Sequence, residues 1–307
     1  MEFTPLTDTQ RATFDRDGFL VVPDAIPPEL VERLRDASDR LYQEGLATDG
    51  LNGRSFWDLR NCLPRDDSFL ELLDWPTTVP LVVQLLGHNL QLITSHLIMR
   101  PPSRPATDET YRASGWHRDG GTAPSDLGAA HPRMFVKIGY WLSDASQVGR
   151  GSIRFIPGSN NWSGRMPELR EGRDPDDAVE MQVEPGTAVL FENRTLHSVG
   201  PNLSDITRKT LFFGYGYRWL RPMDYLLMPE EMLAGCDPVR RQLLGDCTSP
   251  MGYQLPEAEE VPLRAWLQEH AGNGMDPAAE TPGRFASTGR GRRRPASEGH
   301  GDGNRRS

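Results

Sequence analysis

The 307-residue sequence contains no uninterrupted apolar run of roughly 18 residues, so no segment predicts a membrane-spanning helix. Its first residues, MEFTPLTDTQRATFDRDGFLVV, have neither a basic region nor an apolar core, and we therefore expect no secretory leader and a cytoplasmic protein. Only three cysteines are present and none forms a CxxC pair. This scarcity argues against a disulfide framework and against a cysteine-ligated zinc site.

Positive charge is scarce in most of the chain, since the net charge is −9 and only Lys137 and Lys209 are lysines. Seven arginines and two acidic residues give residues 284–307 a charge of +5, so the remaining residues carry −14. An acidic body argues against a nucleic-acid groove, because such a groove needs clustered positive charge. We expect no nucleic-acid partner, and the basic GRGRRRP segment is the only feature that favours one.

Motifs of several large enzyme classes are also absent from the sequence. No GxGxxG follows a predicted strand, and there is no Walker loop and no GxSxG elbow. A hydrophobic content of 37% is nevertheless enough for a sizeable core. The sequence therefore predicts a globular protein outside these three classes.

The helix and strand signals divide the chain into three parts. Residues 1–87 form a helical front: Thr7 caps a helix that ends near Asp17, a strand and a proline turn follow, and further helices are predicted at 27–45, 66–76 and 77–87. Residues 46–64 are predicted to be a loop anchored by buried Phe56 and Trp57.

After residue 87, short β-branched and aromatic runs alternate with turn residues, which is typical of strands. The predicted strands are residues 90–101, 134–142, 151–159, 178–183, 186–192 and 209–219. Helical patterns return at 229–235, 237–245 and 262–270. We predict one α+β domain over residues 1–271 with a β-barrel or sandwich core, and a disordered basic tail over 272–307.

One short motif points to a metal site. In GWHRDGG, His117 and Asp119 are two residues apart, so on an extended strand their side chains share one face. Such a pair needs a third ligand, and a second histidine from another strand would complete the facial set used by non-haem Fe(II) oxygenases. His197, directly after the strand GTAVLF, is the strongest candidate, while His96 is more typical of a hydrogen-bonded core residue.

The spacing of these motifs resembles a known family. GWHRDGG, GRGSIRFIPGSNNW and PGTAVLFENRTLHSVGPNLSDITRKTLFFGY together are similar to the phytanoyl-CoA dioxygenase family of iron- and 2-oxoglutarate-dependent oxygenases. The resemblance covers about residues 10–245 and implies a double-stranded β-helix fold with the N-terminal helices packed on one sheet. Family members often have His after PGS, where this chain has Asn160 and Asn161, so a family contact made there is in question.

The resemblance also implies roles for individual residues. His117, Asp119 and His197 would hold Fe(II), and Arg208 would bind the distal carboxylate of 2-oxoglutarate, with O2 as the second cosubstrate. In related halogenases a small residue replaces the carboxylate, so Asp119 favours hydroxylation, desaturation or cyclisation. Thr195 has the strand parity of His197, which would turn its hydroxyl toward the cosubstrate.

Alternation predicts which side chains line the barrel. In MFVKIGYWL, the face with Lys137 and Trp141 is predicted to line the interior, and the other face to pack under the helices. A buried Lys137 would need an anion such as a 2-oxoglutarate or substrate carboxylate; alternatively, its ammonium group reaches the rim. In RKTLFFGYGYRW the inward positions are Arg208, Thr210, Phe212, Gly214, Gly216 and Arg218.

Two glycines on the inner face either open space for a substrate or let the strand bend. In the first case the substrate is a sizeable, partly apolar molecule, with Trp116, Trp141 and Phe212 as apolar walls and Arg218 as an outer anion contact. The leading hypothesis is an oxygenase acting on such a molecule in specialised metabolism. The alternative is a catalytically inactive, cupin-like binding or regulatory module. The sequence does not indicate an oligomeric state.

Overall fold

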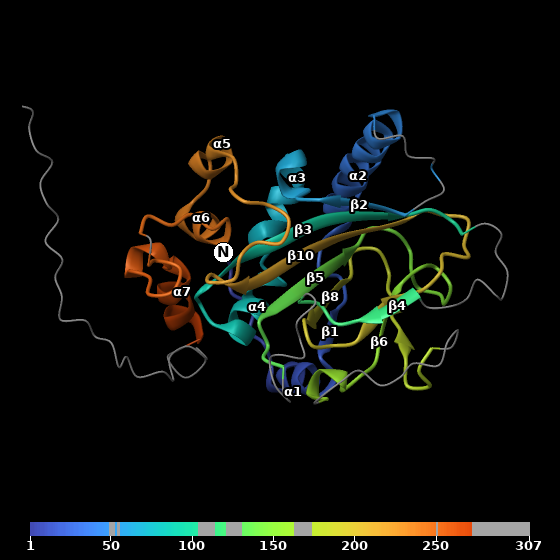
Figure 1. Ribbon diagram of the computed structural model, residues 1–307, viewed down its shortest axis with the longest axis horizontal. Helices are drawn as coiled ribbons and strands as arrows, with labels where there is room; N and C mark the ends of the chain where they lie inside the picture. Colours follow the sequence, from blue (N-terminus) through green and yellow to red (C-terminus); the bar gives the residue numbers. More distant parts are fainter. Residues whose placement is uncertain are drawn as a thin grey trace, which may run out of the picture.

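Two antiparallel sheets form the centre of the computed structural model, which describes residues 1–48, 53, 56–103, 114–120, 131–162, 174–249 and 251–271. The larger sheet has the order β1(Phe19–Val22), β8(Ala188–Glu192), β5(Phe135–Trp141), β10(Arg208–Tyr217), β3(Leu90–Arg100), β2(Trp57–Arg60). The smaller sheet has the order β4(Ser114–His117), β9(His197–Val199), β6(Ile153–Phe155), β7(Val179–Glu180). This is the predicted α+β fold with a double-stranded β-helix core (Figure 1).

Aromatic and aliphatic side chains join the two sheets. Phe155 of the small sheet lies between Phe19 and Phe191 of the large one, with ring centroids 4.6 and 5.3 Å apart. Trp141 and Phe212 complete this layer of five aromatic side chains. Four of them are buried, and Phe19 is partly buried and packs against the others. The interior between the sheets is therefore a packed core at this level rather than an open channel.

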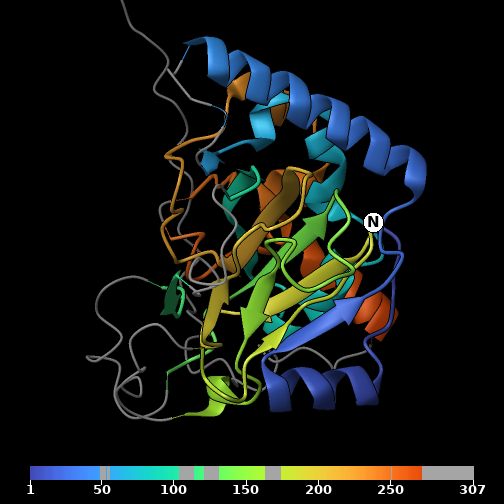
Figure 2. The ribbon, with the colours of Figure 1, turned by 90° about the vertical axis from the view of Figure 1, so that its right-hand side faces the viewer.

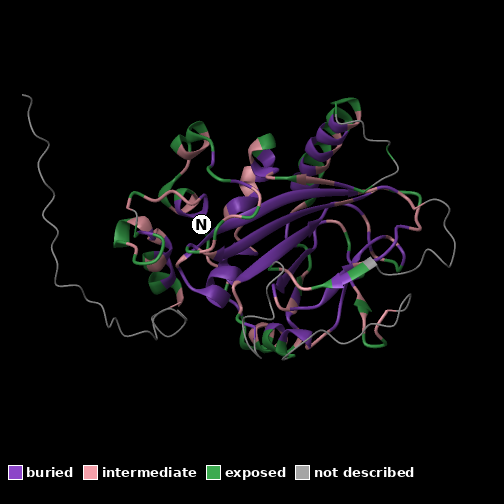
Figure 3. Ribbon diagram, in the orientation of Figure 1, coloured by how far each residue is buried: buried purple, intermediate pink, exposed green. Residues whose placement is uncertain are grey.

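Helices cover the outer face of the large sheet. The helices α2(Pro28–Thr48), α3(Asp67–Glu71) and α4(Val79–Leu86) share one apolar cluster with the outward-facing residues of β5 and β10. Figure 2 shows α2 lying along one side of the molecule and α1(Asp8–Asp17) at the opposite side. The central strands β3, β5, β8 and β10 are almost entirely buried, as Figure 3 shows, because helices cover one face of the sheet and the small sheet the other.

Strand alternation in β5 and β10 is confirmed. Val136, Ile138 and Tyr140 belong to the cluster under the helices, whereas Trp141 belongs to the layer between the sheets. Thr7 caps α1 through a hydrogen bond from the Gln10 amide, and the helix ends at Asp17 as predicted.

The predicted loop 46–64 is wrong in part. Trp57–Arg60 forms β2, the edge strand that pairs with β3, and Phe56 is half exposed rather than buried. The four-residue segment WDLR carries no clear alternation, and its strand conformation comes from backbone pairing with Met99 and its neighbours. Helix α2 also continues beyond Gly45 to Thr48.

The last helices, α5(Glu230–Ala234), α6(Pro238–Leu243) and α7(Pro262–Ala271), gather at the end of the large sheet where β10 finishes (Figure 1). The predicted tail, residues 272–307, lies outside the described residues. In the part of the chain that is described, no single helix is long and apolar enough to cross a membrane; only the bent pair Asp67–Asp74 and Val79–Leu86, taken together, meets those criteria.

Candidate metal centre and cosubstrate site

The three predicted ligands meet at the paired ends of β4 and β9. His117 is the last residue of β4, His197 is the first of β9, and the two face each other in the antiparallel register. Asp119 follows β4 by two residues, and its two carboxylate oxygens lie 3.8 Å from the Nε2 atoms of His117 and His197. One ligand atom from each residue can be chosen so that all three lie within 4.8 Å of one another.

Backbone carbonyls fix the orientation of both imidazoles. His117 Nδ1 lies 2.9 Å from the Gly115 oxygen, and His197 Nδ1 lies 2.9 Å from the Thr195 oxygen. A carbonyl only accepts, so each Nδ1 donates its hydrogen and each Nε2 presents a lone pair to the site. Burial lowers the pKa of His197 to about 4, which keeps this imidazole neutral and able to bind a metal at neutral pH.

Asp119 is held as a carboxylate by Lys137. Burial alone would raise the pKa of Asp119, but the charge and hydrogen bond of Lys137, together with His197 and His117, outweigh this effect and hold the pKa well below its usual range. Lys137 Nζ lies 2.8 Å from Asp119 Oδ2, and both side chains are largely buried. Lys137 lines the interior and does not reach the rim, and its ammonium group pairs with Asp119. The expected contact with a 2-oxoglutarate or substrate carboxylate stays a prediction.

A second feature suits an organic anion. Arg208 is 1% exposed and donates through Nη1 to the Gly151 carbonyl at 2.7 Å, while its Nε and Nη2 have no hydrogen-bond partner among the described residues. Burial, and then the charge of Arg100, lower the pKa of Arg208 to about 9. A buried guanidinium with unsatisfied donors is costly unless a carboxylate binds there, so the fork fits 2-oxoglutarate.

The ligand set fits iron equally well. Two neutral imidazole nitrogens and one carboxylate oxygen on one side of a site leave positions for further ligands, which is the arrangement of non-haem Fe(II) oxygenases. Near Arg208, four more buried polar atoms lack a hydrogen-bond partner in the described part of the chain: Arg100 Nε, Thr210 Oγ1, Trp141 Nε1 and Ser152 Oγ. These atoms offer further contacts to a polar guest.

The family model described as phytanoyl-CoA dioxygenase matches residues 14–210. The chain belongs to the phytanoyl-CoA dioxygenase family. It is 21% identical over 270 residues to dioxygenase olcK of Penicillium canescens, covering 83% of this chain and 86% of that protein. It is 26% identical over 181 residues to a probable alpha-ketoglutarate-dependent hypophosphite dioxygenase of Stutzerimonas stutzeri, covering 53% of this chain and about half, 55%, of that relative.

Solved structures have the same fold. HygX from Streptomyces hygroscopicus, solved with nickel and 2-oxoglutarate bound, matches with a TM-score of 0.56 at 21% identity, over 71% of this chain and 90% of HygX. SnoK, a carbocyclase from nogalamycin biosynthesis, matches with a TM-score of 0.53 at 18% identity, over 80% of this chain and 94% of SnoK. These neighbours share the predicted fold. The family and the relatives by sequence make the chain an iron- and 2-oxoglutarate-dependent dioxygenase.

Two predicted site residues point elsewhere. The Thr195 hydroxyl donates to the Gly18 carbonyl at 2.8 Å instead of facing the cosubstrate. β9 begins only at His197, so strand parity does not extend back to Thr195. Trp116 is not a pocket wall: its Nε1 donates to Asp174 at 3.2 Å and its ring packs in a small cluster with Ile156 and Leu196, on the face of β4 opposite His117.

The roomy pocket inferred from the two glycines is also wrong. A Cβ on Gly214 would lie 2.6 Å from Thr94 Cγ2, and a Cβ on Gly216 would lie 3.0 Å from Leu220 Cδ1. Side chains from neighbouring segments already fill the space that these glycines leave. Of the other predicted walls, Trp141 and Phe212 do lie inside the barrel, with ring centroids 6.0 Å apart.

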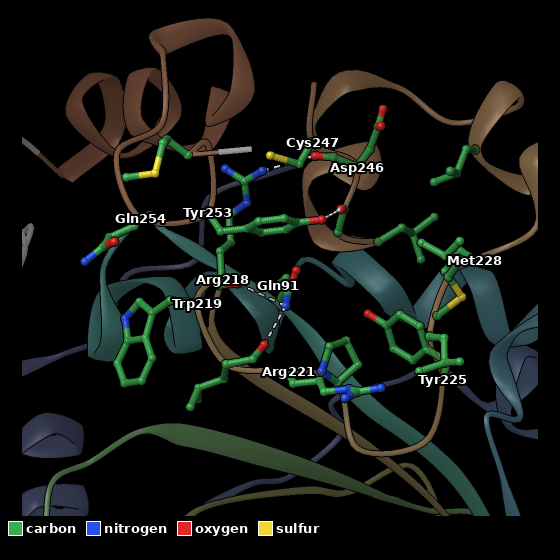
Figure 4. Close-up of a pocket in the computed structure, with 18 of the residues that line it drawn as sticks. Gln91, Arg218, Trp219, Arg221, Tyr225, Met228, Asp246, Cys247, Tyr253 and Gln254 are labelled. Carbon is green, nitrogen blue, oxygen red and sulfur yellow. Dashed lines mark hydrogen bonds between the residues drawn. The ribbon is translucent and has the colours of Figure 1, made fainter. Parts of the chain in front are cut away.

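Arg218 lies in a separate cavity at the far end of β10. Its Nη1 donates to the Gly252 carbonyl at 3.0 Å and its Nη2 to the Asp246 carbonyl at 3.1 Å (Figure 4). None of the three predicted metal ligands lines this cavity. The prediction that Arg218 is the outer anion contact of a pocket that opens beside the iron is therefore wrong, because Arg218 lines a different cavity.

His96 has more functional potential than the sequence indicated. Its Nδ1 lies 2.9 Å from Asp58 Oδ1, which agrees with a hydrogen-bonded core histidine. Its Nε2, however, is buried and has no partner within the described residues, and its ring stacks on Phe212 with centroids 5.1 Å apart. On β3, His96 and Arg100 are four residues apart, so their side chains lie on the same face of the strand. This spacing was the signal in the sequence that His96 faces the interior.

Asn160 occupies the position near which relatives often have His. Its Nδ2 donates to Glu192 Oε1 at 2.7 Å and to the Asp15 carbonyl at 3.1 Å. It therefore links the turn after β6 to β8 and to the end of α1.

Proposed function

We propose that His117, Asp119 and His197 hold Fe(II), and that Arg208 binds the distal carboxylate of 2-oxoglutarate. We further propose that the enzyme oxidises an unactivated C–H bond of a small molecule. The observation that carries the assignment is the convergence of two oriented Nε2 atoms on one lysine-paired carboxylate, in a barrel that also buries an unsatisfied guanidinium. An inactive binding module would not need all of these features.

Charge balance explains the place of Lys137. A divalent ion, the Asp119 carboxylate and a 2-oxoglutarate dianion together carry one excess negative charge, which Arg208 alone would balance. Lys137 offsets the Asp119 carboxylate at 2.8 Å from its Oδ2, and so leaves the charges of the metal ion and of Arg208 to attract the dianion. This compensation favours binding of the dianion, because an uncompensated buried charge is costly.

The chain's own groups position the reactants and limit water. The carbonyls of Gly115 and Thr195 hold the imidazoles, and Phe191 packs against His197 with ring centroids 5.1 Å apart. When bound, Fe(II) supplies coordination positions at which 2-oxoglutarate and O2 react to oxidise the substrate.

Two observations support the reaction type and the substrate class. Asp119 occupies the carboxylate position, which favours hydroxylation, desaturation or cyclisation over halogenation. Relatives by sequence include the iron/alpha-ketoglutarate-dependent dioxygenase ausO of Aspergillus calidoustus, 23% identical over 79% of this chain, and the structural neighbour SnoK is a carbocyclase from nogalamycin biosynthesis. We therefore place the substrate in specialised metabolism.

Anaerobic reconstitution tests the proposal directly. Metal-free protein is loaded with Fe(II) and 2-oxoglutarate, exposed to O2, and assayed for succinate. Succinate formation that depends on iron and is lost in His197→Ala supports the assignment. No succinate from a protein that demonstrably binds both iron and 2-oxoglutarate would contradict it.

A further inference from the structure

A cavity of about 600 Å³ lies where β10 ends, away from the metal centre (Figure 4). Arg208 and Arg218 are ten residues apart on one extended segment, a separation of roughly 33 Å. Leu220 lines the cavity and packs against Gly216. These two residues lie between the cavity and the part of the large sheet that carries Lys137. The volume lies within the range of small-molecule sites, and the cavity is distinct from the proposed cosubstrate site.

A buried cation lines this cavity. Arg218 is 1% exposed, and two backbone carbonyls accept from its Nη atoms, but its Nε has no hydrogen-bond partner among the described residues. No carboxylate of the described chain forms an ion pair with Arg218. The nearby Asp246 carboxylate pairs with Arg241 instead, at 2.6 Å. Carbonyl dipoles compensate a guanidinium only in part, so the site retains a preference for an anion.

The other lining residues add to this preference. Arg221 lies at the exposed rim of the cavity and forms no ion pair with the described residues. Two acidic residues line the cavity, Asp246, which is paired with Arg241, and Glu230. The two arginines therefore outweigh the single unpaired carboxylate. An anion that enters the cavity meets a net positive charge.

The walls are mainly aromatic and aliphatic. Apolar and aromatic lining residues include Trp219, Leu220, Tyr225, Leu226, Leu227, Met228, Leu233, Met251 and Tyr253. Two of them, Leu226 and Leu227, are 74% and 85% exposed and give the cavity an apolar rim. The Arg218 guanidinium lies 5.5 Å from the Tyr253 ring centroid, so this ring carries part of the charge compensation.

We propose that the Arg218 cavity is a second small-molecule site, which binds an organic anion with an apolar body. Arg218 and Arg221 attract the acid group, and the aromatic and aliphatic walls hold the rest of the molecule. Binding there needs neither iron nor 2-oxoglutarate, so the site does not depend on the proposed oxygenase reaction.

Two fluorescent probes that differ in charge test this site in metal-free protein. Anilinonaphthalene sulfonate carries an acid group, and N-phenylnaphthylamine is its neutral counterpart. The sulfonate is expected to bind at one saturable site, ~10-fold or more tightly than the neutral probe. Equal affinities for the two probes would overturn the proposal.

Variants then locate the binding. Arg218→Met should lower sulfonate affinity to that of the neutral probe, and Leu233→Trp should block both by filling the cavity. If Arg218→Met fails to fold after losing its contacts with the 246–252 loop, Arg221→Met provides the same test with a smaller, several-fold loss. Arg65→Met, an exposed arginine outside the cavity, is the matched control. Sulfonate binding that survives Leu233→Trp, or that neither arginine substitution weakens, refutes the proposal.

Discussion

Replacing Arg208 by methionine should weaken 2-oxoglutarate binding strongly and leave the stability of the ligand-free protein nearly unchanged. The substitution keeps an unbranched side chain but removes a buried cation whose Nε and Nη2 have no partner in the described chain. The ligand-free variant loses the bond to the Gly151 carbonyl and also loses the cost of burying an unpaired charge. These effects oppose each other, so the ligand-free stability should change little.

The effect on ligand binding should be large. A charge-assisted contact is worth ~1.5–3 kcal/mol, which corresponds to ~10–150-fold in affinity. At a 2-oxoglutarate concentration of ~100 times the wild-type Kd, binding stabilises the wild type by ~2.7 kcal/mol. A variant that binds ~100-fold more weakly gains only ~0.4 kcal/mol at the same concentration. For a domain of this size these values correspond to rises in Tm of roughly 5–10 °C and about 1 °C.

The assay is thermal unfolding with Ni(II) in place of Fe(II), so that no turnover occurs, with and without 2-oxoglutarate. Lys209→Met is the matched control, because the neighbouring lysine points to the other face of β10 and pairs with Asp39 at 2.6 Å. The control should respond to 2-oxoglutarate like the wild type. An equal rise in Tm for Arg208→Met and the wild type would refute the role of Arg208.

Three further substitutions probe the site. His197→Ala should abolish Ni(II) binding by calorimetry while the circular dichroism spectrum is retained; tight binding by the variant would contradict its role as a ligand. Lys137→Met should weaken 2-oxoglutarate binding several-fold and spare Ni(II) binding, because the charge next to Asp119 is lost; an unchanged 2-oxoglutarate affinity would contradict the charge-balance argument. Gly214→Val should lower the free energy of unfolding by ~1–3 kcal/mol through overpacking against Thr94, and a denaturant midpoint equal to that of the wild type would contradict this.

Alternation predicted side-chain direction wherever a strand was regular. The inward positions of β5 and the first half of β10 follow the two-residue period, so Lys137, Trp141, Arg208 and Phe212 lie inside as expected. The proposed metal ligands could also be predicted from the strand pattern, because His117 and His197 occupy paired strand ends.

Alternation failed where a strand ends. Thr195 precedes the start of β9, and Arg218 follows the end of β10. Outside a strand the two-residue period no longer determines the direction of a side chain. The strand β2 was missed for a different reason, since its conformation depends on a partner distant in sequence.

The glycines of β10 show how a correct local observation led to a wrong functional interpretation. A glycine on an inner face marks a place where something approaches closely, but the sequence does not say what approaches. At Gly214 two side chains approach, those of Thr94 and Lys137, whose Cγ2 and Cγ atoms would lie 2.6 and 3.3 Å from an added Cβ. The ammonium group of that lysine then reaches Asp119, at 2.8 Å. Gly214 therefore serves the proposed metal centre by giving room to the lysine that balances its charge, and the space needed by the substrate lies elsewhere.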